Sequence, residues 1–387
     1  MSMLRPLARA VALLAAVGLA TTSCAGRVGT AKGGDEELPQ PDRELKFPQE
    51  GFMKVYDNGL TLFVLPDPYT RLVQFDVRQR VGSREDPEGK IGMAHFVEHL
   101  MFQMPADGPG SEKLMSDIQR HALSFNAYTS PDETHYMHTG TADELETYMK
   151  YTALRLGYDC EAVSEDAFMR ERDVVRNEHR WRSTGVDAKV RDALTELAFD
   201  PGHPYRHKSA GEDLQLASIT PQETCDFIEK YYTASQATLV VTGDIDPLDV
   251  LELANKYLQP LPKVTPPPRK PVPPANFGKS SGQIVASVQK PTAVVLFRMP
   301  KRFTKDYAAS QAAIQTLFMA VSFFTSRRGS VVERFYPTVL GGKEALVFGI
   351  GIETKKARDL DRGVDDEPAY IILMHSSLRL CPFASLR

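Results

Sequence analysis

The sequence predicts an α+β fold: a two-layer mixed sheet with helices packed on one face, followed by a second, related but incomplete domain. Segments with the alternating pattern of strands precede most segments with the helical period, which is the order typical of α+β proteins. A proline-rich stretch then interrupts the chain, and a shorter series of predicted strands and helix follows it. A chain of 387 residues also exceeds what one hydrophobic core usually supports, so two domains are expected.

The first 24 residues have the pattern of a bacterial export signal. Arg5 and Arg9 precede an apolar run from Ala10 to Ala20, which is too short for a retained membrane span, and small residues then lead to Cys24. These small residues resemble a lipobox and predict lipidation of Cys24, with ordinary cleavage near Ala25 as the alternative. Either route predicts an exported protein, in the periplasm or as an outer-membrane lipoprotein that meets the membrane only through its lipid anchor.

Composition narrows the classes of partner. Hydrophobic residues make up 42% of the chain and charged residues 25%, a balance typical of globular proteins. The formal net charge is −4 and the basic residues form no stripe, so no nucleic-acid partner is expected. Residues 25–45 are rich in Gly, Pro and charge and predict a flexible tether. Cys160, Cys225 and Cys381 are scattered, so we expect isolated buried thiols and no disulfide framework.

The first predicted domain, residues 46–258, begins with two strands. Residues 60–65 and 72–81 are separated by Pro66-Asp67-Pro68, which predicts a hairpin or neighbouring strands. Residues 91–102 follow the pattern of a helix that is apolar nearly all round and is therefore buried. The remaining segments are expected to be extended at 124–138 and 238–242, and helical at 143–156, 165–181 and 221–232.

Residues 259–276 form the predicted linker, because a proline-rich composition propagates neither a helix nor a central strand. In the second domain, residues 277–387, we expect strands at 283–297 and 346–352 that flank a helix near 310–323. The end of the chain lacks the further strands and helices of a complete second domain. We therefore expect a partial domain, either because the chain is an incomplete gene product or because a partner chain supplies the missing contacts.

The chemistry of the sequence concentrates in the predicted buried helix. His95, Glu98 and His99 are its only ionisable residues, and their spacing puts them on one face. Burying an acid and two imidazoles without strong partners is costly, whereas a zinc ion would bind both imidazoles and leave the carboxylate beside a water. Core polar groups satisfied by hydrogen bonds are the alternative. Three such groups together favour zinc.

A catalytic zinc usually takes three protein ligands, and the predicted helix 165–181 offers the third. Glu171 and Glu178 stand two helical turns apart on the stripe that Phe168 and Val175 occupy, so both carboxylates are expected to face a buried surface. A charged helix with many ion pairs is the alternative, because arginines are interspersed. The stripe favours a metal ligand without deciding between the two glutamates.

Further motifs accompany these residues between about Tyr56 and Pro247. They are Asp57-Asn58-Gly59-Leu60, Val81-Gly82-Ser83-Arg84, His95-Phe96-Val97-Glu98-His99, Asn126-Ala127-Tyr128-Thr129 with Asp132 and Thr134, Glu171-Arg172-Asp173-Val174-Val175 with Glu178, His203-Pro204-Tyr205, and Val241-Thr242-Gly243-Asp244. In content and order they resemble the pitrilysin/insulinase family of zinc peptidases. The resemblance implies a metalloendopeptidase that uses zinc to hydrolyse peptides or unfolded proteins.

The resemblance also implies a role for each candidate residue of the metal site. His95, His99 and Glu178 would ligate zinc, and Glu171 would support the site from the second shell of contacts. Glu98 would be the general base that takes a proton from the attacking water and later gives it to the leaving amine.

The segment 124–138 resembles the family's substrate-facing edge strand, to which a peptide adds as an extra strand. Asn126 and Ala127 would lie nearest the scissile bond. A plain edge strand is the alternative for this segment. His135 and His138 are not expected to bind metal, because their odd spacing puts them on opposite faces of a strand.

The family's second half supplies an Arg and a Tyr, at R-x6-Y spacing, to the transition state, and this pair cannot be placed in the sequence. Arg327, Arg328, Arg334 and Tyr336 lie in about the right region, but Gly329 stands seven residues before Tyr336. We expect these residues to be no more than a solvated helix end. A partner subunit could supply the missing contacts. A non-catalytic structural or binding subunit of the same fold, inactive alone, is the alternative to a peptidase.

Overall fold

The computed structural model describes residues 51–108, 110–158, 160–276, 281–285, 290–325, 332–355 and 370–375. The described residues form two compact units. The first contains residues up to 185 together with 201–273, and the second contains residues 186–200 and those from 274 onward. The predicted export signal with Cys24, and the predicted tether, lie outside the described residues. Within those residues, no helix has both the length and the apolar character needed to cross a membrane.

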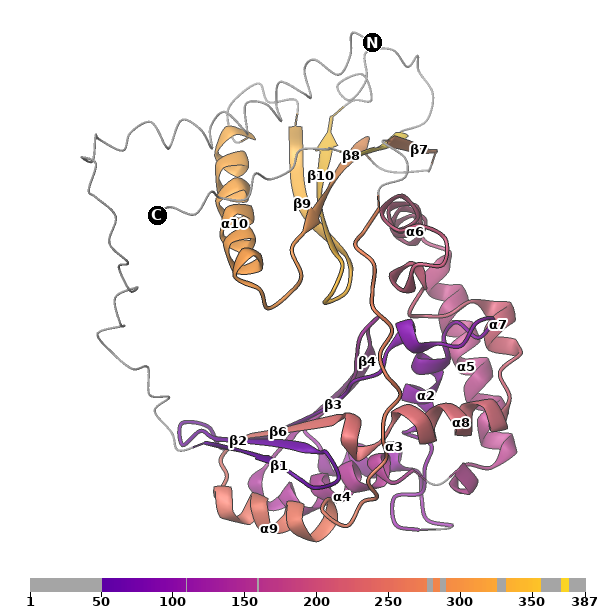
Figure 1. Ribbon diagram of the computed structural model, residues 1–387, viewed down its shortest axis with the longest axis vertical. Coiled ribbons are helices and arrows are strands. Elements are labelled where there is room, and N and C mark those ends of the chain that lie inside the picture. The colour runs from indigo at the N-terminus through magenta and orange to yellow at the C-terminus, as the bar shows by residue number, and fades with distance from the viewer. Residues whose placement is uncertain are drawn as a thin grey trace, which may run out of the picture. The chain divides into compact units, whose positions relative to one another are not determined.

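The first unit is built on a six-stranded sheet with the order β1-β2-β6-β3-β5-β4 (Figure 1). Its strands are β1 Phe52–Val55, β2 Thr61–Pro66, β3 Val73–Gln79, β4 Ser124–Thr129, β5 Thr134–Gly140 and β6 Ala237–Gly243. β2 and β6 run parallel, while the other neighbours are antiparallel. The prediction that the strands at 60–65 and 72–81 are neighbours is therefore wrong. After β2 the Asp67 N–H bonds to the carbonyl of Gly243 at 2.7 Å, so the chain leaves β2 along β6, which lies between β2 and β3.

Helices gather on one face of this sheet (Figure 1). The helices of the unit are α2 Met93–Leu100, α3 Leu114–His121, α4 Leu145–Leu156, α5 Glu165–Ser183, α7 Asp213–Ala217, α8 Pro221–Tyr231 and α9 Pro247–Tyr257. Alternate side chains of β6 are fully buried while those between them remain partly exposed, as expected when helices cover one face. The core contains Phe75 and Val241 of the sheet with Phe96 and Tyr148 of the helices. The predicted α+β class is confirmed.

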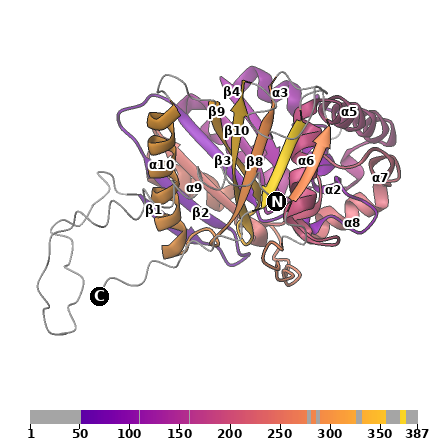
Figure 2. The same cartoon turned by 90° about the horizontal axis from the view of Figure 1, so that it is seen from above.

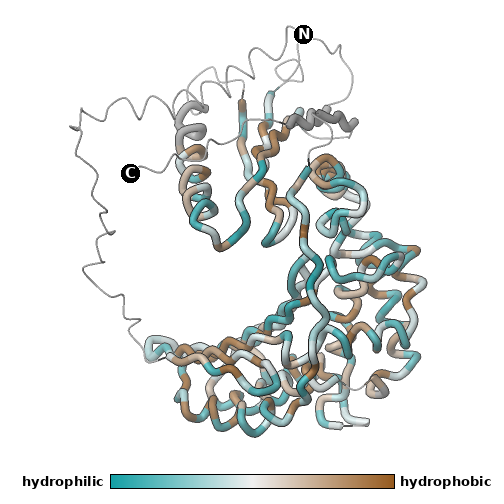
Figure 3. The backbone as a smooth tube through the Cα atoms, in the orientation of Figure 1, coloured by the Kyte–Doolittle hydropathy of each residue, from teal (hydrophilic) through white to brown (hydrophobic). Residues whose placement is uncertain are grey.

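The second unit contains α6 Val186–Ala198 and a five-stranded mixed sheet with the order β7-β11-β8-β10-β9. Its strands are β7 Ser281–Val285, β8 Thr292–Met299, β9 Val332–Gly341, β10 Leu346–Thr354 and β11 Tyr370–His375. Helix α10, Lys305–Thr325, runs beside the sheet (Figure 2), where Phe318 meets Phe348 edge to face. Apolar segments along β8 and β10, brown in Figure 3, form the buried cluster against which α10 packs.

The residues considered for the transition-state pair do not form a helix end. Arg334 and Tyr336 lie on strand β9, so that prediction is wrong for them, and Arg327 and Arg328 lie outside the described residues. β9 pairs with β10 along its length, and Arg334 forms an ion pair with Glu353 on β10 at 2.9 Å. Tyr336 lies opposite Gly351, where any Cβ would come within 2.2 Å of the tyrosine ring.

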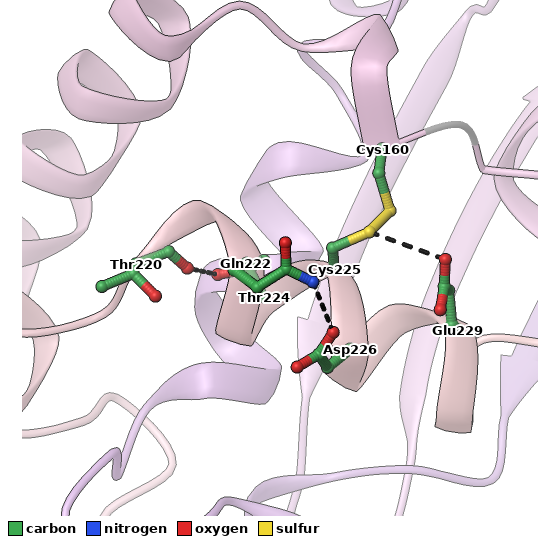
Figure 4. The surroundings of a disulfide bond; sticks show 7 residues. All are labelled: Cys160, Thr220, Gln222, Thr224, Cys225, Asp226 and Glu229. Carbon is green, nitrogen blue, oxygen red and sulfur yellow. Dashed lines mark hydrogen bonds between the residues drawn. A yellow bond between two sulfur atoms is a disulfide. The ribbon is translucent and has the colours of Figure 1, made fainter.

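A disulfide links Cys160, in the 3₁₀ turn Cys160–Ala162, to Cys225 on α8 (Figure 4). Their Cα atoms are 5.7 Å apart, within the range of natural disulfides. The prediction of isolated thiols is wrong for this pair. The two residues are 65 positions apart and meet only because α8 packs beside the turn that precedes α5, which spacing along the chain does not reveal. Cys381 lies outside the described residues.

Candidate metal centre

Helix α2 carries three of the predicted site residues. Seven of its eight residues are buried, so its polar groups must find partners inside the protein. The helix begins at Gly92, whose φ of 104° lies in the left-handed region. Asp86 caps this start, because its carboxylate accepts the N–H groups of Gly92 and Ala94 at 2.7 and 2.8 Å. A Cβ at position 92 would also lie 2.6 Å from the Cα of Gly211, so glycine is required there.

Helix α5 supplies the carboxylates. Ser164 caps its start by accepting the N–H of Ala167 at 3.3 Å. Phe168 fixes α5 against α2, because its ring meets Phe96 edge to face with centroids 5.0 Å apart. Glu171 and Glu178 lie on the same side of α5 as Phe168, and their side chains are only 13% and 22% exposed. Both carboxylates therefore face α2, as their stripe predicts.

The two helices bring His95, His99 and Glu178 together. Nε2 of His99 lies 3.2 Å from Oε2 of Glu178, and Nε2 of His95 lies 3.9 Å from the same oxygen. One ligand atom from each residue lies within 4.8 Å of the other two. Tetrahedral zinc with bonds of about 2.0–2.2 Å separates its ligand atoms by about 3.3 Å. Two imidazoles and a carboxylate at these distances fit a zinc ion, and this donor set occurs in catalytic zinc sites.

The electrostatics of the cluster differ between its two histidines. Burial lowers the pKa of His95 to about 4, and the nearby His99 adds to the effect. The His95 imidazole is therefore neutral, as metal ligation requires. Burial also disfavours the charged form of His99, but hydrogen bonds to Glu171 and Glu178 outweigh it and raise that pKa to about 9. Contact with His99 is in turn the main reason that the pKa of Glu178 falls to about 2.

Glu98 lies on the same helix, three residues after His95 and beside His99. The hydroxyl of Thr129, at the end of β4, donates to Oε2 of Glu98 at 2.5 Å. Burial raises the pKa of Glu98 to about 7, and the hydrogen bond from Thr129 opposes this rise. A carboxyl group that titrates near neutral pH is well suited to accept and return a proton.

Neighbouring side chains orient the cluster. Glu171 lies 2.9 Å from Nδ1 of His99, the ring nitrogen opposite the one that faces Glu178. Such a partner fixes the tautomer and the orientation of a metal-binding imidazole. Arg182 forms an ion pair with Oε1 of Glu178 at 2.6 Å and holds the second carboxylate oxygen. Sequence reasoning missed Arg182 and the contact of Thr129 with Glu98, although Arg182 stands at the i+4 position where an ion pair with Glu178 is expected.

The predicted substrate-binding residues lie on β4, which forms one edge of the six-stranded sheet. Asn126 is exposed and Ala127 is partly buried. The Asn126 side-chain oxygen accepts the N–H of Ala127 at 2.9 Å, so this backbone donor is already bonded. The end of β4 reaches the metal-site cluster through the contact between Thr129 and Glu98.

His135 and His138 lie on opposite faces of β5, away from the cluster. The ring nitrogens of His135 lie 3.3 Å from Asp76 and 3.1 Å from Glu133. His138 stacks on Tyr148 of α4, and its Nε2 lies 3.3 Å from Nη1 of Arg155. Among the residues that the structure describes, the other group with metal-ligand spacing is Cys160, Cys225 and Glu229, and there the disulfide already joins both sulfur atoms.

Comparison with known proteins relates the chain to zinc proteases. A family profile described as Insulinase (Peptidase family M16) matches residues 63–206, and one described as Peptidase M16 inactive domain matches residues 218–363. The chain is 30% identical over 208 residues to the zinc protease PqqE of Helicobacter pylori, covering 53% of the chain and 46% of that protein. It is 28% identical over 216 residues to the beta subunit of the mitochondrial-processing peptidase of Neurospora crassa, covering 54% and 43%. These alignments span less than half the length of either relative.

Solved structures share the fold. A protease from Helicobacter pylori aligns with a TM-score of 0.64 at 22% identity, covering 81% of this chain and 78% of that one. The first half of the periplasmic protease PqqL from Escherichia coli aligns with a TM-score of 0.62 at 18% identity, covering 80% and 69%. The two family profiles together match more than half of the chain. The predicted resemblance is therefore confirmed, and the chain belongs to the M16 family of peptidases, the insulinase family.

Proposed function

We propose that the chain is a zinc-dependent endopeptidase. The observation that carries the proposal is the convergence of His95, His99 and Glu178 within 4.8 Å, with Glu98 on the same helix. Relatives named as zinc proteases support this assignment. The M16 peptidase family is established by the comparisons, whereas the activity of this chain and the roles of its residues are our proposal.

In this mechanism Nε2 of His95, Nε2 of His99 and the carboxylate of Glu178 hold the metal. Zinc, when bound, supplies a Lewis acid that polarises the substrate carbonyl and acidifies water. Glu171 keeps His99 oriented from the far side of its ring. Glu98 takes a proton from the attacking water at its carboxylate and returns it to the leaving amine.

We propose that the substrate is an extended peptide or an unfolded protein that pairs with β4. An edge strand offers backbone groups to such a segment, and Asn126 and Ala127 lie in the middle of this edge. A peptide that bonds to the Ala127 N–H replaces the Asn126 side-chain oxygen as its acceptor. The contact between Thr129 and Glu98 supports this binding mode, because it joins the end of the strand to the proposed base.

The decisive experiment compares the wild-type chain with Glu98→Gln. Glu98→Gln removes the proton acceptor and should lower kcat for an unfolded protein or peptide library by about 10²-fold or more, with bound zinc unchanged. Glu252→Gln, an exposed residue on α9, is the matched control and should leave kcat at the wild-type value. A chelator should abolish cleavage, and added zinc should restore it. Purified protein that contains no zinc, or a cleavage rate that Glu98→Gln leaves unchanged, would contradict the peptidase proposal.

A second candidate is a non-catalytic structural or binding subunit. The match of residues 218–363 to a domain described as inactive favours this non-catalytic candidate. It predicts zinc-independent binding of a partner and no cleavage by the isolated chain. Mass measurement of the purified protein identifies any co-eluting chain. Cleavage measured with and without that chain then distinguishes the two candidates, because a partner that restores cleavage supports a heteromeric peptidase.

We also propose that the protein is exported. The export pattern of residues 1–24 supports this, as does the description of the similar PqqL structure as a periplasmic protease. Mass spectrometry of the mature N-terminus separates the two processing routes. A lipidated Cys24 indicates an anchored lipoprotein, and an unmodified N-terminus near Ala25 indicates ordinary cleavage.

A further inference from the structure

The turn between β4 and β5, residues 130–133, is held from beneath by the loop that follows β3. The N–H groups of Ser83 and Arg84 donate to the carbonyls of Ser130 and Pro131, both at 3.1 Å. Gly82 permits this approach, since a Cβ there would lie 2.2 Å from the oxygen of Ser130. Two backbone bonds therefore fix the first half of the turn.

Buried charges fix the second half of the turn. Nη1 of Arg84 lies 2.9 Å from Oδ1 of Asp132, and both side chains are only 3% exposed. The hydroxyl of Tyr205 donates to the same carboxylate oxygen at 2.7 Å. Nη2 of Arg84 donates to the carbonyl of Lys270 at 2.6 Å, so the turn is also tied to the proline-rich segment.

Arg269, in that segment, reaches the turn directly. Its Nη2 donates to the carbonyl of Asp132 at 2.6 Å and to the carbonyl of Arg80, the residue after β3, at 3.0 Å. Its Nε lies 3.2 Å from Oε1 of Glu85, whose side chain is 9% exposed. One guanidinium thus joins three separate points of the first unit. A lysine has a single nitrogen and cannot match this planar arrangement.

Two positive and two acidic side chains meet in this cluster. Arg84 and Arg269 face Asp132 and Glu85, and burial raises the pKa of Glu85 to about 7. Removing one member of a buried set of this kind leaves an uncompensated charge, which is costly. Loss of the Arg269 guanidinium therefore removes two hydrogen bonds to backbone carbonyls and the ion pair with Glu85 from the cluster that holds the turn.

The turn begins immediately after the residue that contacts the proposed base. Thr129 is the last residue of β4, and its hydroxyl donates to Glu98 at 2.5 Å. Thr134, its partner across the strands, is anchored separately by a bond from its hydroxyl to the carbonyl of Val81 at 2.9 Å. The position of the turn therefore determines the distance between the Thr129 hydroxyl and the Glu98 carboxylate.

We propose that Arg269 is a positioning residue for the peptidase: it fixes the turn between β4 and β5 and, through Thr129, the orientation of Glu98. This inference rests on the proposed function of Glu98. It assigns a catalytic consequence to a segment at the end of the first unit that contributes no proposed metal ligand. Lys270 provides a matched control, because only its backbone carbonyl takes part while its side chain is exposed.

The first test needs no activity. Hydrogen–deuterium exchange is measured on the full chain as wild type, Arg269→Gln and Lys270→Ala. Peptides that cover residues 124–134 should exchange on the order of fivefold faster in Arg269→Gln, because the turn opens more often, and should be unchanged in Lys270→Ala. Exchange in Arg269→Gln that equals the wild-type rate would overturn the inference.

The second test uses the zinc-loaded chain. Arg269→Gln and Thr129→Val should each lower kcat on the order of tenfold with bound zinc unchanged, because both disturb the placement of the same base. The double variant should be no slower than the worse single variant, since one path carries both effects. Additive losses, or loss of zinc from Arg269→Gln, would contradict a role through Thr129. An inactive wild type with altered exchange would refute the peptidase while leaving the fixing of the turn supported.

Discussion

Removal of the disulfide between Cys160 and Cys225 should destabilise the first unit by about 4 kcal/mol. The bond closes a segment of 65 residues. In the loop-entropy treatment, the unfolded chain gains about 2.1 + 1.5R ln n cal/mol/K when a loop of n residues is opened, which gives about 4 kcal/mol at 25 °C for this loop. For a unit of this size each kcal/mol corresponds to roughly 2–4 °C, so the melting temperature should fall by roughly 10 °C.

The assay is scanning calorimetry of the full chain as wild type and as the Cys160→Ser/Cys225→Ser double variant, each with and without a phosphine reductant. Reductant should bring the wild type to the melting temperature of the double variant and should leave the double variant unchanged. Each single variant should behave like the double variant, because either substitution prevents the bond. A wild type that is indifferent to reductant, or a double variant within about 1 kcal/mol of the wild type, would refute the loop-closure reasoning.

Two further predictions concern pH and capping. The carboxylates of Asp76 and Glu133 raise the pKa of His135 against the opposing effect of burial, although the ring nitrogens meet them at ion-pair distances without hydrogen-bond geometry. A histidine whose pKa is raised by folding stabilises the folded state fully below about pH 6.5, and this stabilisation is lost as the pH rises through the folded-state pKa. The difference in unfolding free energy between the wild type and His135→Gln, measured by urea unfolding, should therefore shrink from about pH 6.5 upward. A difference that grows with pH would contradict the ion pairs. Asp86→Ala leaves two buried N–H groups at the start of α2 without their acceptor and should cost about 2 kcal/mol in the same assay, whereas Asp86→Asn, which keeps one oxygen, should cost less. An alanine variant as stable as the wild type would show that the cap contributes nothing.

Helix α2, which carries the candidate metal ligands His95 and His99, was predictable because its signal is local. His95, Glu98 and His99 stand out within one apolar stretch, and helical spacing alone puts them on one face. The stripe of α5 placed both glutamates toward a buried surface for the same reason. Spacing alone did not show which nitrogen of the His99 ring each glutamate contacts. The structure places Glu178 against Nε2 and Glu171 against Nδ1 of His99.

The non-local features could not be predicted from the same patterns. Alternation in β2 and β6 shows which side chains face the core, but it carries no record that residues 61–66 pair in parallel with residues 238–243. The contact between Thr129 and Glu98, and the pairing of Cys160 with Cys225, likewise depend on how distant segments pack. Helix α6 follows α5 directly in sequence yet belongs to the second unit, which no local pattern reveals.

The side chain of Asn126 occupies one backbone donor on the exposed edge of β4, the N–H of Ala127. An unprotected sheet edge invites other chains to pair with it, which leads to aggregation. Here one donor of that edge is already satisfied by the neighbouring amide, so a passing strand gains nothing at that position unless it first displaces a bond. An extended segment with carbonyls in register exchanges one bond for another at little net cost. The Asn126 side chain therefore lowers the tendency of this edge position to pair with another strand.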